Sequence, residues 1–489
     1  MNEETGVVLY STLTRRKEAL VPDADGLVRI YFCGPTVYGR VHIGNARPFV
    51  VFSVLKRHLE RRGLRVRLVS NVTDVNDKIY DAARAAGVPS REFARLQTEA
   101  YMADTDRLGL GRPDAEPQVT TSMPEIIALI ERLVERGLAY PSAGDVYYRV
   151  KRFPGYGKLS GRRLDEMVAA EPGQKEDPLD FALWKGRKPE EDAWWESPWG
   201  PGRPGWHIEC SAMAEATLGR HLQVHGGGID LVFPHHENEI AQSEGAHGGE
   251  MAAIWMHNEM LELSGDKMSK SLGNIAPLSE VLDAWPAEVV ITFFLTSHYR
   301  SRLPFSEERL AEAATVTTRL TNALRALDRA IRGAPEEGHD PALARTLVES
   351  RNGFFVALDD DFATPEAFAA LFELVKAGNA AADGRKAGAG QLREARRELA
   401  GLLDVLGLAG LDPGPDAAVP AEVLDLLEQR DAARGDRDFA RADALRDRIR
   451  ALGYELVDTA EGPQVYAAGG SAPRPLREAR RAAEPPEGC

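Results

Sequence analysis

The chain has 489 residues, a formal net charge of −15 and three cysteines, Cys33, Cys210 and Cys489. This length allows about three domains with large cores, and the acidic total excludes a chain that is basic throughout, although a local basic patch is compatible with it. Three cysteines are too few for a disulfide framework. The opening sequence MNEETGVVLYSTLTRR has no long apolar core, so we expect no signal peptide. No apolar run reaches the ~18–20 residues that cross a bilayer, and we expect a cytoplasmic protein that does not enter a membrane.

The first part of the chain alternates strand and helix patterns. GLVRIYFCG (26–34) is apolar, β-rich and bounded by glycines, which predicts a buried strand. The segment 49–63 mixes apolar and basic residues at helical spacing and ends on glycine. LRVRLVSNVTD (64–74) predicts a second strand, and DVNDKIYDAARAAG (74–87) predicts a second helix. This order predicts a doubly wound parallel sheet of the Rossmann type. In such sheets ligands bind at the carboxyl ends of the strands, where Cys33 and the loop after it would lie.

Beyond the second predicted helix, the predicted secondary structure changes several times along the chain. A mixed region rich in Trp, Gly and Pro is followed by a sheet-like segment, HLQVHGGGIDLVF (221–233), and then by a helix from the next two histidines onward. That order predicts an insertion between two halves of one sheet. From about residue 305 the pattern is helical, and 412–420 has the composition of a linker. Two helices broken at Gly435 follow. We therefore expect an α/β fold with an insertion, then a helical bundle and a small α+β domain.

The motif HIGN (42–45) follows the first predicted strand and opens a helix. An imidazole at a helix N-terminus can meet a phosphate, because the free amides and the helix dipole both favour anions. Gly44 would allow a ligand to approach the backbone closely. The alternative, a turn with an exposed histidine, is favoured on these four letters alone.

A second motif, DKMSKSLGN (266–274), places two lysines three residues apart among serines and glycine. A mobile cationic loop of this kind could neutralise the charge that develops on a leaving pyrophosphate. For most sequences with this charge spacing, a solvated turn is the correct interpretation. The pentad KMSKS is much more specific than its charges.

The segment FPHHENEIAQ (233–242) holds two histidines and two glutamates within five residues. His235 and Glu239 are four apart, so a helix places them on one face, whereas His236 would point elsewhere. Cys33 and Cys210 could complete a zinc site with two cysteines, one histidine and one glutamate. No CxxC pair supports this, and a polar helix start with a buried strand cysteine explains the same residues.

Together these segments resemble a known family. HIGN and KMSKS, in this order and in this predicted fold, resemble the signature pair of class I aminoacyl-tRNA synthetases. Longer stretches closely resemble the cysteinyl-tRNA synthetase family: YFCGPTVYGRVHIGNARPFVVFSVL (31–55), PGWHIECSAM (204–213), HGGGIDLVFPHHENEIAQSE (225–244) and KMSKSLGN (267–274). The resemblance extends from about residue 7 to 467 and includes RADALRD (441–447). These long motifs are highly specific in combination.

The resemblance implies roles for the residues that match the family's motifs. The implied ligands of one zinc ion are Cys33, Cys210, His235 and Glu239. The implied ATP-phosphate contacts and catalytic residues are His42, Asn45, Lys267 and Lys270. The implied adenosine site comprises Gly226, Gly227 and Asp230, and the implied amino-acid pocket comprises Cys33, His235 and Trp206. One departure is Asn76, where the family often has an aspartate in TDxDDKI.

The resemblance also implies a domain plan and a reaction. The expected parts are the first half of the catalytic domain (1–112), a connective insertion (113–220), the second half with the KMSKS loop (221–304), a tRNA-binding helical bundle (305–408), a small anticodon-binding domain (421–467) and a disordered tail (468–489). The implied substrates are L-cysteine, ATP with Mg²⁺, and tRNA(Cys), and we expect a monomer. Zinc would select the thiolate of cysteine over the hydroxyl of serine, which a pocket that recognises shape alone cannot do strongly.

Two other functions compete with this one. The cysteine ligase of mycothiol synthesis resembles the same catalytic half and passes cysteine to an aminosugar, but a small acceptor needs no helical C-terminal region. A non-catalytic tRNA-binding or zinc-binding protein would not need intact HIGN and KMSKS motifs.

A run of arginines near the C-terminus predicts a surface that contacts tRNA phosphates. It comprises Arg430, Arg434, Arg437, Arg441, Arg446, Arg448 and Arg450. Acidic residues alternate with them, so a solvated helix face is the alternative. On the second helix of this region, Ala442, Leu445, Ile449 and Leu452 are expected to share one buried face.

Overall fold

The computed structural model of the chain describes residues 6–167, 174–263, 266–267, 276–384, 386–412, 420–459 and 462–467. The chain divides into two compact units. The first comprises residues 1–279, 297–305 and 355–365, and the second comprises 280–296, 306–354 and 366–489. Within the described ranges, no helix is both long and apolar enough to cross a membrane.

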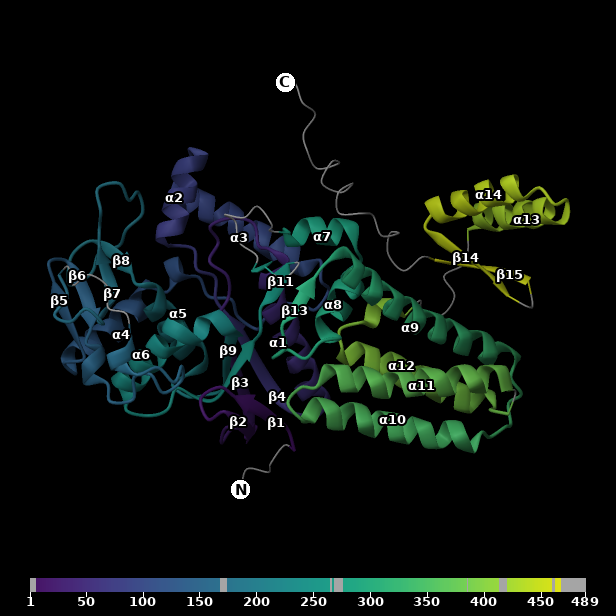
Figure 1. Cartoon of the computed structure of the whole chain (residues 1–489), viewed down its shortest axis with the longest axis horizontal. Helices are drawn as coiled ribbons and strands as arrows, with labels where there is room; N and C mark the ends of the chain where they lie inside the picture. Colours follow the sequence, from purple (N-terminus) through teal and green to yellow (C-terminus); the bar gives the residue numbers. More distant parts are fainter. Residues whose placement is uncertain are drawn as a thin grey trace. The chain divides into compact units, whose positions relative to one another are not determined.

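A four-stranded parallel sheet forms the centre of the first unit (Figure 1). Its strands, in spatial order, are β10 (Ala252–Asn258), β9 (Leu222–Gly228), β3 (Leu27–Phe32) and β4 (Arg65–Ser70). All neighbouring pairs are parallel. The chain winds outward from β3 to β4 and later from β9 to β10 in the other direction. This confirms the predicted doubly wound sheet, and the reversal between β3 and β9 creates a crevice at their carboxyl ends.

Helices α1 (Ile43–Arg61) and α6 (Glu237–His247) connect β3 to β4 and β9 to β10. In the view of Figure 1 they lie on either side of β3 and β9. α1 begins at Ile43, so HIGN opens a helix as predicted, but the segment expected from residue 49 starts earlier than its pattern suggested. Gly44 and Pro48 are typical of loops, yet both lie in the first two turns of α1.

A mixed segment lies between β4 and β9, as the predicted insertion requires, and it includes helices that precede residue 113, where the insertion was expected to begin. Its helices are α2 (Asp77–Ala86), α3 (Ser90–Asp106), α4 (Met123–Glu135) and α5 (Trp206–Leu218). Its antiparallel strands, in spatial order, are β5 (Ala139–Ser142), β6 (Asp145–Tyr148), β7 (Phe181–Gly186) and β8 (Gly202–Pro204). Tyr148 and Trp184 are buried in the same apolar core as Tyr31 and Cys33. The insertion therefore packs directly against the strand end that carries Cys33.

Two smaller sheets complete the first unit. One is the antiparallel pair β1 (Val8–Ser11) and β2 (Arg16–Ala19), and the other contains β11 (Leu261–Leu263), β12 (Asp266–Lys267) and β13 (Leu303–Phe305). Buried Asp361 fastens the segment 355–365 to this unit. Its carboxylate accepts hydrogen bonds from the Tyr10 backbone N–H at 2.8 Å, the Tyr299 hydroxyl at 2.6 Å and the Arg300 Nε at 2.9 Å.

The chain is helical after β13, as expected. Helices α7 (Leu278–Ala284) and α8 (Ala287–Leu295) precede β13, and α9 (Glu307–Gly333), α10 (Pro341–Asp359), α11 (Thr364–Gly384) and α12 (Ala389–Val405) follow it. The hydroxyl of Ser306 caps α9 by accepting the Arg309 backbone N–H. Along α9, Leu320 and Leu324 are fully buried, and α9 packs against α8 and α12. These contacts form an apolar core between helices rather than against a sheet.

The last described part is small and of α+β type, as predicted. It contains α13 (Ala421–Gly435), α14 (Phe439–Ala451) and the antiparallel strands β14 (Tyr454–Thr459) and β15 (Gly462–Ala467). Its core comprises Val423, Leu426, Leu445, Ile449, Leu456 and Val465. The prediction that Leu452 joins this face is wrong, because α14 ends at Ala451 and Leu452 is exposed. Arg430 is buried beside Asp431 at 2.9 Å, so its inclusion in an arginine surface is also wrong. The predicted tail (468–489) lies outside the described residues, as does most of the predicted linker.

Candidate active site and metal centre

A cavity of about 650 Å³ opens at the carboxyl ends of β3 and β9. Its walls include Cys33, the start of α1 with His42 and Asn45, and Trp206 at the start of α5. Leu261 on β11, which leads toward the KMSKS segment, also lines it. The crevice expected where the sheet reverses direction is therefore present, and motifs that are far apart in the sequence share it.

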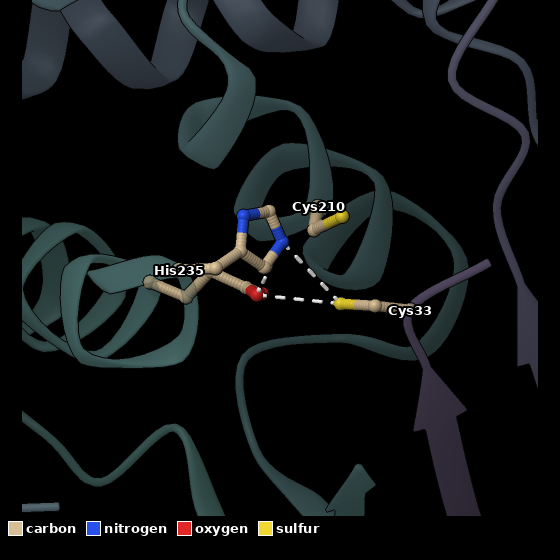
Figure 2. Close-up of side chains that lie close together, drawn as sticks. Cys33, Cys210 and His235 are labelled. Carbon is tan, nitrogen blue, oxygen red and sulfur yellow. Dashed lines mark hydrogen bonds and ion pairs between the residues drawn. The ribbon is translucent and has the colours of Figure 1, made fainter. Parts of the chain in front are cut away.

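The four predicted metal ligands meet at one point beside this cavity. Figure 2 shows Cys33, Cys210 and His235 gathered from three separate segments of the chain. The Cys33 Sγ lies 3.5 Å from the His235 Nε2 and 3.4 Å from a Glu239 carboxylate oxygen. The His235 Nε2 lies 3.1 Å from the same oxygen. One donor atom from each of Cys33, Cys210, His235 and Glu239 lies within 4.8 Å of the others, and all four side chains are buried.

This donor set fits a zinc ion. Zinc in proteins prefers sulfur and imidazole donors and accepts carboxylates. Tetrahedral bonds of normal length would separate the donor atoms by about 3.3–3.8 Å, which the contacts around Cys33 already approach. Neither Cys33 nor Cys210 is in a disulfide. A buried set of this composition is costly without a partner ion, so the cluster can hold a metal.

Two further histidines belong to the cluster, and the sequence pattern missed both. The His236 Nε2 lies 3.3 Å from the Cys33 Sγ, and the His225 Nε2 lies 3.2 Å from a Glu239 oxygen. The prediction that His236 points elsewhere is wrong. It counted only the neighbour four residues away, but residues three apart also share a helix face, and the His236 Nε2 lies 3.8 Å from a Glu239 oxygen. Val232–His236 form a π-type turn with an extended backbone at Phe233, and α6 begins at Glu237. The sheet-like segment also ends earlier than expected, at Gly228.

When no metal is bound, burial and neighbouring charges set the protonation state of each residue in the cluster. Burial raises the pKa of Cys210, but a hydrogen bond with Cys33 and the charge of His235 outweigh burial and lower this pKa to about 6. Burial lowers the pKa of His235, whereas the charges of Glu239 and Cys210 raise it to about 10. Burial raises the pKa of Cys33 well above its usual value. Burial also opposes ionisation of Glu239, but His225 and His235 hold the pKa of Glu239 well below normal. At neutral pH, Cys210 and Glu239 are therefore ionised, while Cys33 and His235 keep their protons.

Neighbouring side chains orient His235. The His207 Nδ1 lies 2.9 Å from the His235 Nδ1, on the ring nitrogen that faces away from the cluster. The ring of Trp206 lies over His235, with centroids 4.3 Å apart. Trp206 is 36% exposed and lines the cavity. Trp206 therefore contacts the ring of His235 and also lines the cavity.

Glu237, between the cluster residues, has a structural role. Its carboxylate accepts backbone N–H bonds from Gly157 at 2.9 Å and Ser160 at 2.8 Å. The residue is fully buried, so its charge does not face solvent. Glu237 ties the inserted segment to the start of α6.

The HIGN residues form the N-terminus of α1. His42 is the N-cap residue, and its backbone N–H donates to the Asn45 Oδ1 at 3.2 Å. A Cβ atom at Gly44 would lie 3.0 Å from the His42 ring, so the glycine makes room for the imidazole. His42, Gly44 and Asn45 all line the cavity. This arrangement can present an imidazole, an amide and the positive end of the helix dipole to an anion.

The expected adenosine residues fall into two groups. Asp230 lines the cavity together with Gly228, whereas Gly226 and Gly227 do not. A Cβ atom at Gly226 would lie 2.3 Å from the Met256 carbonyl oxygen and 2.4 Å from the Phe52 ring. Gly226 therefore allows close packing of β9 against β10 and α1, and its adenosine role stays a prediction.

The KMSKS motif is described only in part. Lys267 lies in β12 and pairs with Glu262 of β11 in the antiparallel register. Lys270 and residues 268–275 lie outside the described residues. The segment resumes at Ala276, whose carbonyl accepts the Ile43 backbone N–H at 2.9 Å. The start of α1 therefore contacts Ala276, which follows the KMSKS motif in the sequence.

The unusual residue Asn76 is the N-cap of α2. Its Oδ1 accepts the Lys78 backbone N–H at 3.1 Å. Asn and Asp cap helices about equally well, so this role needs no charge. We expect Asn76→Asp to change the free energy of unfolding by less than about 0.5 kcal/mol and Asn76→Ala to lower it by about 1 kcal/mol. Thermal unfolding of the two variants checks this, and a large loss in Asn76→Asp would contradict it.

The sequence matches two described families. Residues 19–315 match the family "tRNA synthetases class I (C) catalytic domain", and residues 353–410 match the DALR domain. A cysteine–tRNA ligase of Symbiobacterium thermophilum is 45% identical over 474 residues, covering 94% of this chain and 98% of that protein. A cysteine–tRNA ligase of Anaeromyxobacter dehalogenans is 46% identical over 484 residues, with 94% and 98% covered.

Solved structures show the same fold at lower identity. Mycobacterium tuberculosis methionyl-tRNA synthetase in complex with methionyl-adenylate aligns with a TM-score of 0.59 at 16% identity, over 78% of this chain and 90% of that chain. Agrobacterium radiobacter K84 LeuRS aligns with a TM-score of 0.60 at 13% identity, over 81% and 86%. With the catalytic-domain match and the near full-length relatives, these findings establish that the chain belongs to the cysteine–tRNA ligase family of class I tRNA synthetases.

Proposed function

We propose that this aminoacyl-tRNA ligase activates L-cysteine with ATP, forming cysteinyl-adenylate and pyrophosphate, and then transfers cysteine to the terminal adenosine of tRNA(Cys). The observation that carries the proposal is the buried cluster of Cys33, Cys210, His235 and Glu239. Its Cys33 reaches the wall of the same cavity that His42 and Asn45 line. A thiol-selective donor set and an anion-binding helix start serve, respectively, the side chain of cysteine and the phosphates of ATP.

Activation then needs positioning and charge stabilisation rather than covalent catalysis. The cysteine carboxylate attacks the α-phosphate, and pyrophosphate leaves. His42 and Asn45 bind the phosphates at the N-terminus of α1, where the helix dipole favours negative charge. Lys267 and Lys270 neutralise the charge on the leaving group, with Mg²⁺ accompanying ATP. Gly226, Gly227 and Asp230 seat the adenosine.

Selection of cysteine over serine relies on the cluster. A bound zinc ion would supply a soft acceptor that prefers a thiolate to a hydroxyl. Cys33, Cys210, His235 and Glu239 would hold this ion, and Trp206 would cover the substrate side chain. Shape alone gives only ~1–3 kcal/mol for so small a difference. The chain therefore needs no separate editing domain.

Binding of tRNA is assigned to the helical regions. In this proposal the bundle (305–408) contacts the anticodon stem and the small domain (421–467) contacts the anticodon. The arginine surface now excludes buried Arg430. Its exposed members are Arg434, Arg437, Arg441, Arg448 and Arg450. A monomeric state and a cytoplasmic location also stay predictions.

Pyrophosphate exchange and tRNA charging test this function. Cysteine should drive ATP–pyrophosphate exchange, serine should not, and AMP release should then depend on tRNA(Cys). An aminosugar in place of tRNA distinguishes the cysteine ligase of mycothiol synthesis. A protein that shows no cysteine-dependent exchange would refute the proposal and favour a non-catalytic tRNA-binding or zinc-binding role.

Zinc uptake should release protons. In the metal-free cluster Cys33 and His235 are protonated at neutral pH, because both have pKa values above 7. Both must lose a proton to bind metal. The apparent zinc affinity of metal-free protein should therefore rise with pH, by up to about two decades per pH unit near neutrality. Titrations with a competing chelator at several pH values check the slope, and a pH-independent affinity would contradict it.

A further inference from the structure

One wall of the cavity is not used by the groups described so far. The loop after β3 lines the cavity and contacts a different neighbouring segment at each end. At its start, Thr36 bridges to Thr73, which follows β4, and the Val37 N–H donates to the Thr73 carbonyl at 3.1 Å. At its end, His42 bridges to Pro277 beside the KMSKS segment. The cavity therefore has a β4 side, distinct from the side where His42 bridges to Pro277.

Four lysine or arginine side chains line the cavity among the described residues: Arg40, Arg47, Lys78 and Lys185. Arg47 is buried and donates to three backbone carbonyls, those of Glu259, His298 and Ser301. Arg40 is held by both oxygens of Asp104, each at 2.7 Å. Lys185 pairs with Asp77 at 2.8 Å. These three cations are already engaged by the protein.

Lys78 differs from the other three. Its ammonium lies over the ring of Tyr38, 5.1 Å from the centroid, and no ion pair joins it to a carboxylate within the described residues. It is the second residue of α2 and is exposed. A cation at a helix N-terminus opposes the helix dipole and is mildly unfavourable. The fold thus keeps an unpaired lysine at a position that helix stability disfavours, facing the cavity from its β4 side.

We propose that Lys78 binds a backbone phosphate at the 3′ end of the tRNA during the transfer step. In that step the terminal ribose hydroxyl forms an ester bond with the cysteinyl carbonyl carbon. The acyl–phosphate bond breaks, AMP leaves with the bonding electrons, and the hydroxyl proton is released to solvent. The phosphates of ATP are expected on the other side, between His42 and the KMSKS lysines. Lys78 therefore binds the tRNA, which is the second polyanionic substrate. The contact with the Tyr38 ring fixes the position of its ammonium.

This inference rests on the proposed function, and separate assays of the two steps test it. Lys78→Ala should leave cysteine-dependent pyrophosphate exchange within about twofold of the wild type. Transfer from preformed cysteinyl-adenylate at subsaturating tRNA should fall about tenfold or more, as expected for a lost charged hydrogen bond. Lys78→Arg should recover most of the rate. The affinity for tRNA should also depend less on salt. In a plot of log affinity against log salt concentration, the slope should become shallower by roughly 0.7, the contribution of one phosphate contact on a single strand.

The matched control is Arg84→Ala. Arg84 is exposed on the same helix, pairs with Asp81 at 3.3 Å and does not line the cavity. This variant should change neither step. The melting temperature of Lys78→Ala should stay equal or rise slightly, because an unfavourable charge is removed.

Three outcomes are distinguishable. Normal transfer by Lys78→Ala overturns the inference alone. An equal loss in exchange and transfer also overturns it, because the lysine would then bind ATP or the adenylate. If the wild-type protein shows no cysteine-dependent pyrophosphate exchange, the proposed function itself is refuted.

Discussion

Replacing His235 with alanine is expected to lower the zinc content from about one ion per chain to a small fraction and to abolish cysteine-dependent pyrophosphate exchange. His235 provides the only imidazole in the proposed ligand set, and its Nε2 lies within 3.5 Å of both the Cys33 Sγ and a Glu239 oxygen. Even the loss of a residue that only orients a ligand typically costs 10–100-fold in metal affinity, so loss of a ligand should exceed about 100-fold. Metal analysis and exchange assays on the same preparations measure both effects.

His221→Ala is the matched control for that experiment. His221 lies immediately before β9, is exposed, and contacts the Glu250 carbonyl at 3.1 Å. Its replacement should change neither zinc content nor exchange.

In the wild type, the preference for cysteine over serine should exceed the ~1–3 kcal/mol that shape provides. A zinc-free protein with full activity, or near-equal activation of serine, would contradict the assignment.

The sequence predicted the sheet, the insertion and the identities of the four clustered side chains, for different physical reasons. Strand and helix periodicity is local, so β3 and β4 follow from short segments, and their alternation with helices indicates a doubly wound sheet. The spacing of His235 and Glu239 also predicted their proximity, because Glu239 lies in α6. The prediction failed for His236 because it considered only the spacing of four, whereas residues three apart also share a helix face, and His236 lies 3.8 Å from a Glu239 oxygen.

Other members of the site could not be predicted because they depend on contacts between distant segments. His225 lies on β9 and reaches Glu239 through the packing of β9 against α6. His207 meets His235 because α5 begins at Trp206 and directs its first turn toward the cluster. Gly226 matched a family motif, yet its surroundings show a packing constraint from Met256 and Phe52 that a sequence alone cannot reveal.

Replacing Arg203 with methionine is expected to destabilise the protein by about 3–5 kcal/mol, the usual cost of removing one partner of a buried ion pair. Arg203 lies on β8, and its Nε donates to a Glu191 oxygen at 3.1 Å, with both side chains buried. Its guanidinium also pairs with Asp77, the first residue of α2. Methionine fills a similar volume but leaves the Glu191 carboxylate buried without a cation. Thermal and urea unfolding measure the loss.

Lys188→Met separates this buried pair from ordinary surface charge. The Lys188 Nζ lies 3.9 Å from the same Asp77, but its side chain is 56% exposed, and exposed pairs contribute less than about 1 kcal/mol. Adding Glu191→Gln to Arg203→Met should restore part of the stability, because it removes the stranded charge. Equal losses in Arg203→Met and Lys188→Met would contradict the argument.

Arg203→Met should also affect the second step of the proposed reaction, the transfer of cysteine to tRNA. Arg203 fixes Asp77, and the next residue, Lys78, is the cation proposed to bind the tRNA end. Below its melting temperature, Arg203→Met should therefore lose more of the transfer rate than of pyrophosphate exchange, since His42 and the metal cluster lie on other elements. Lys188→Met should show no such split. A uniform loss of both steps would indicate that Arg203 supports the whole cavity rather than the position of α2.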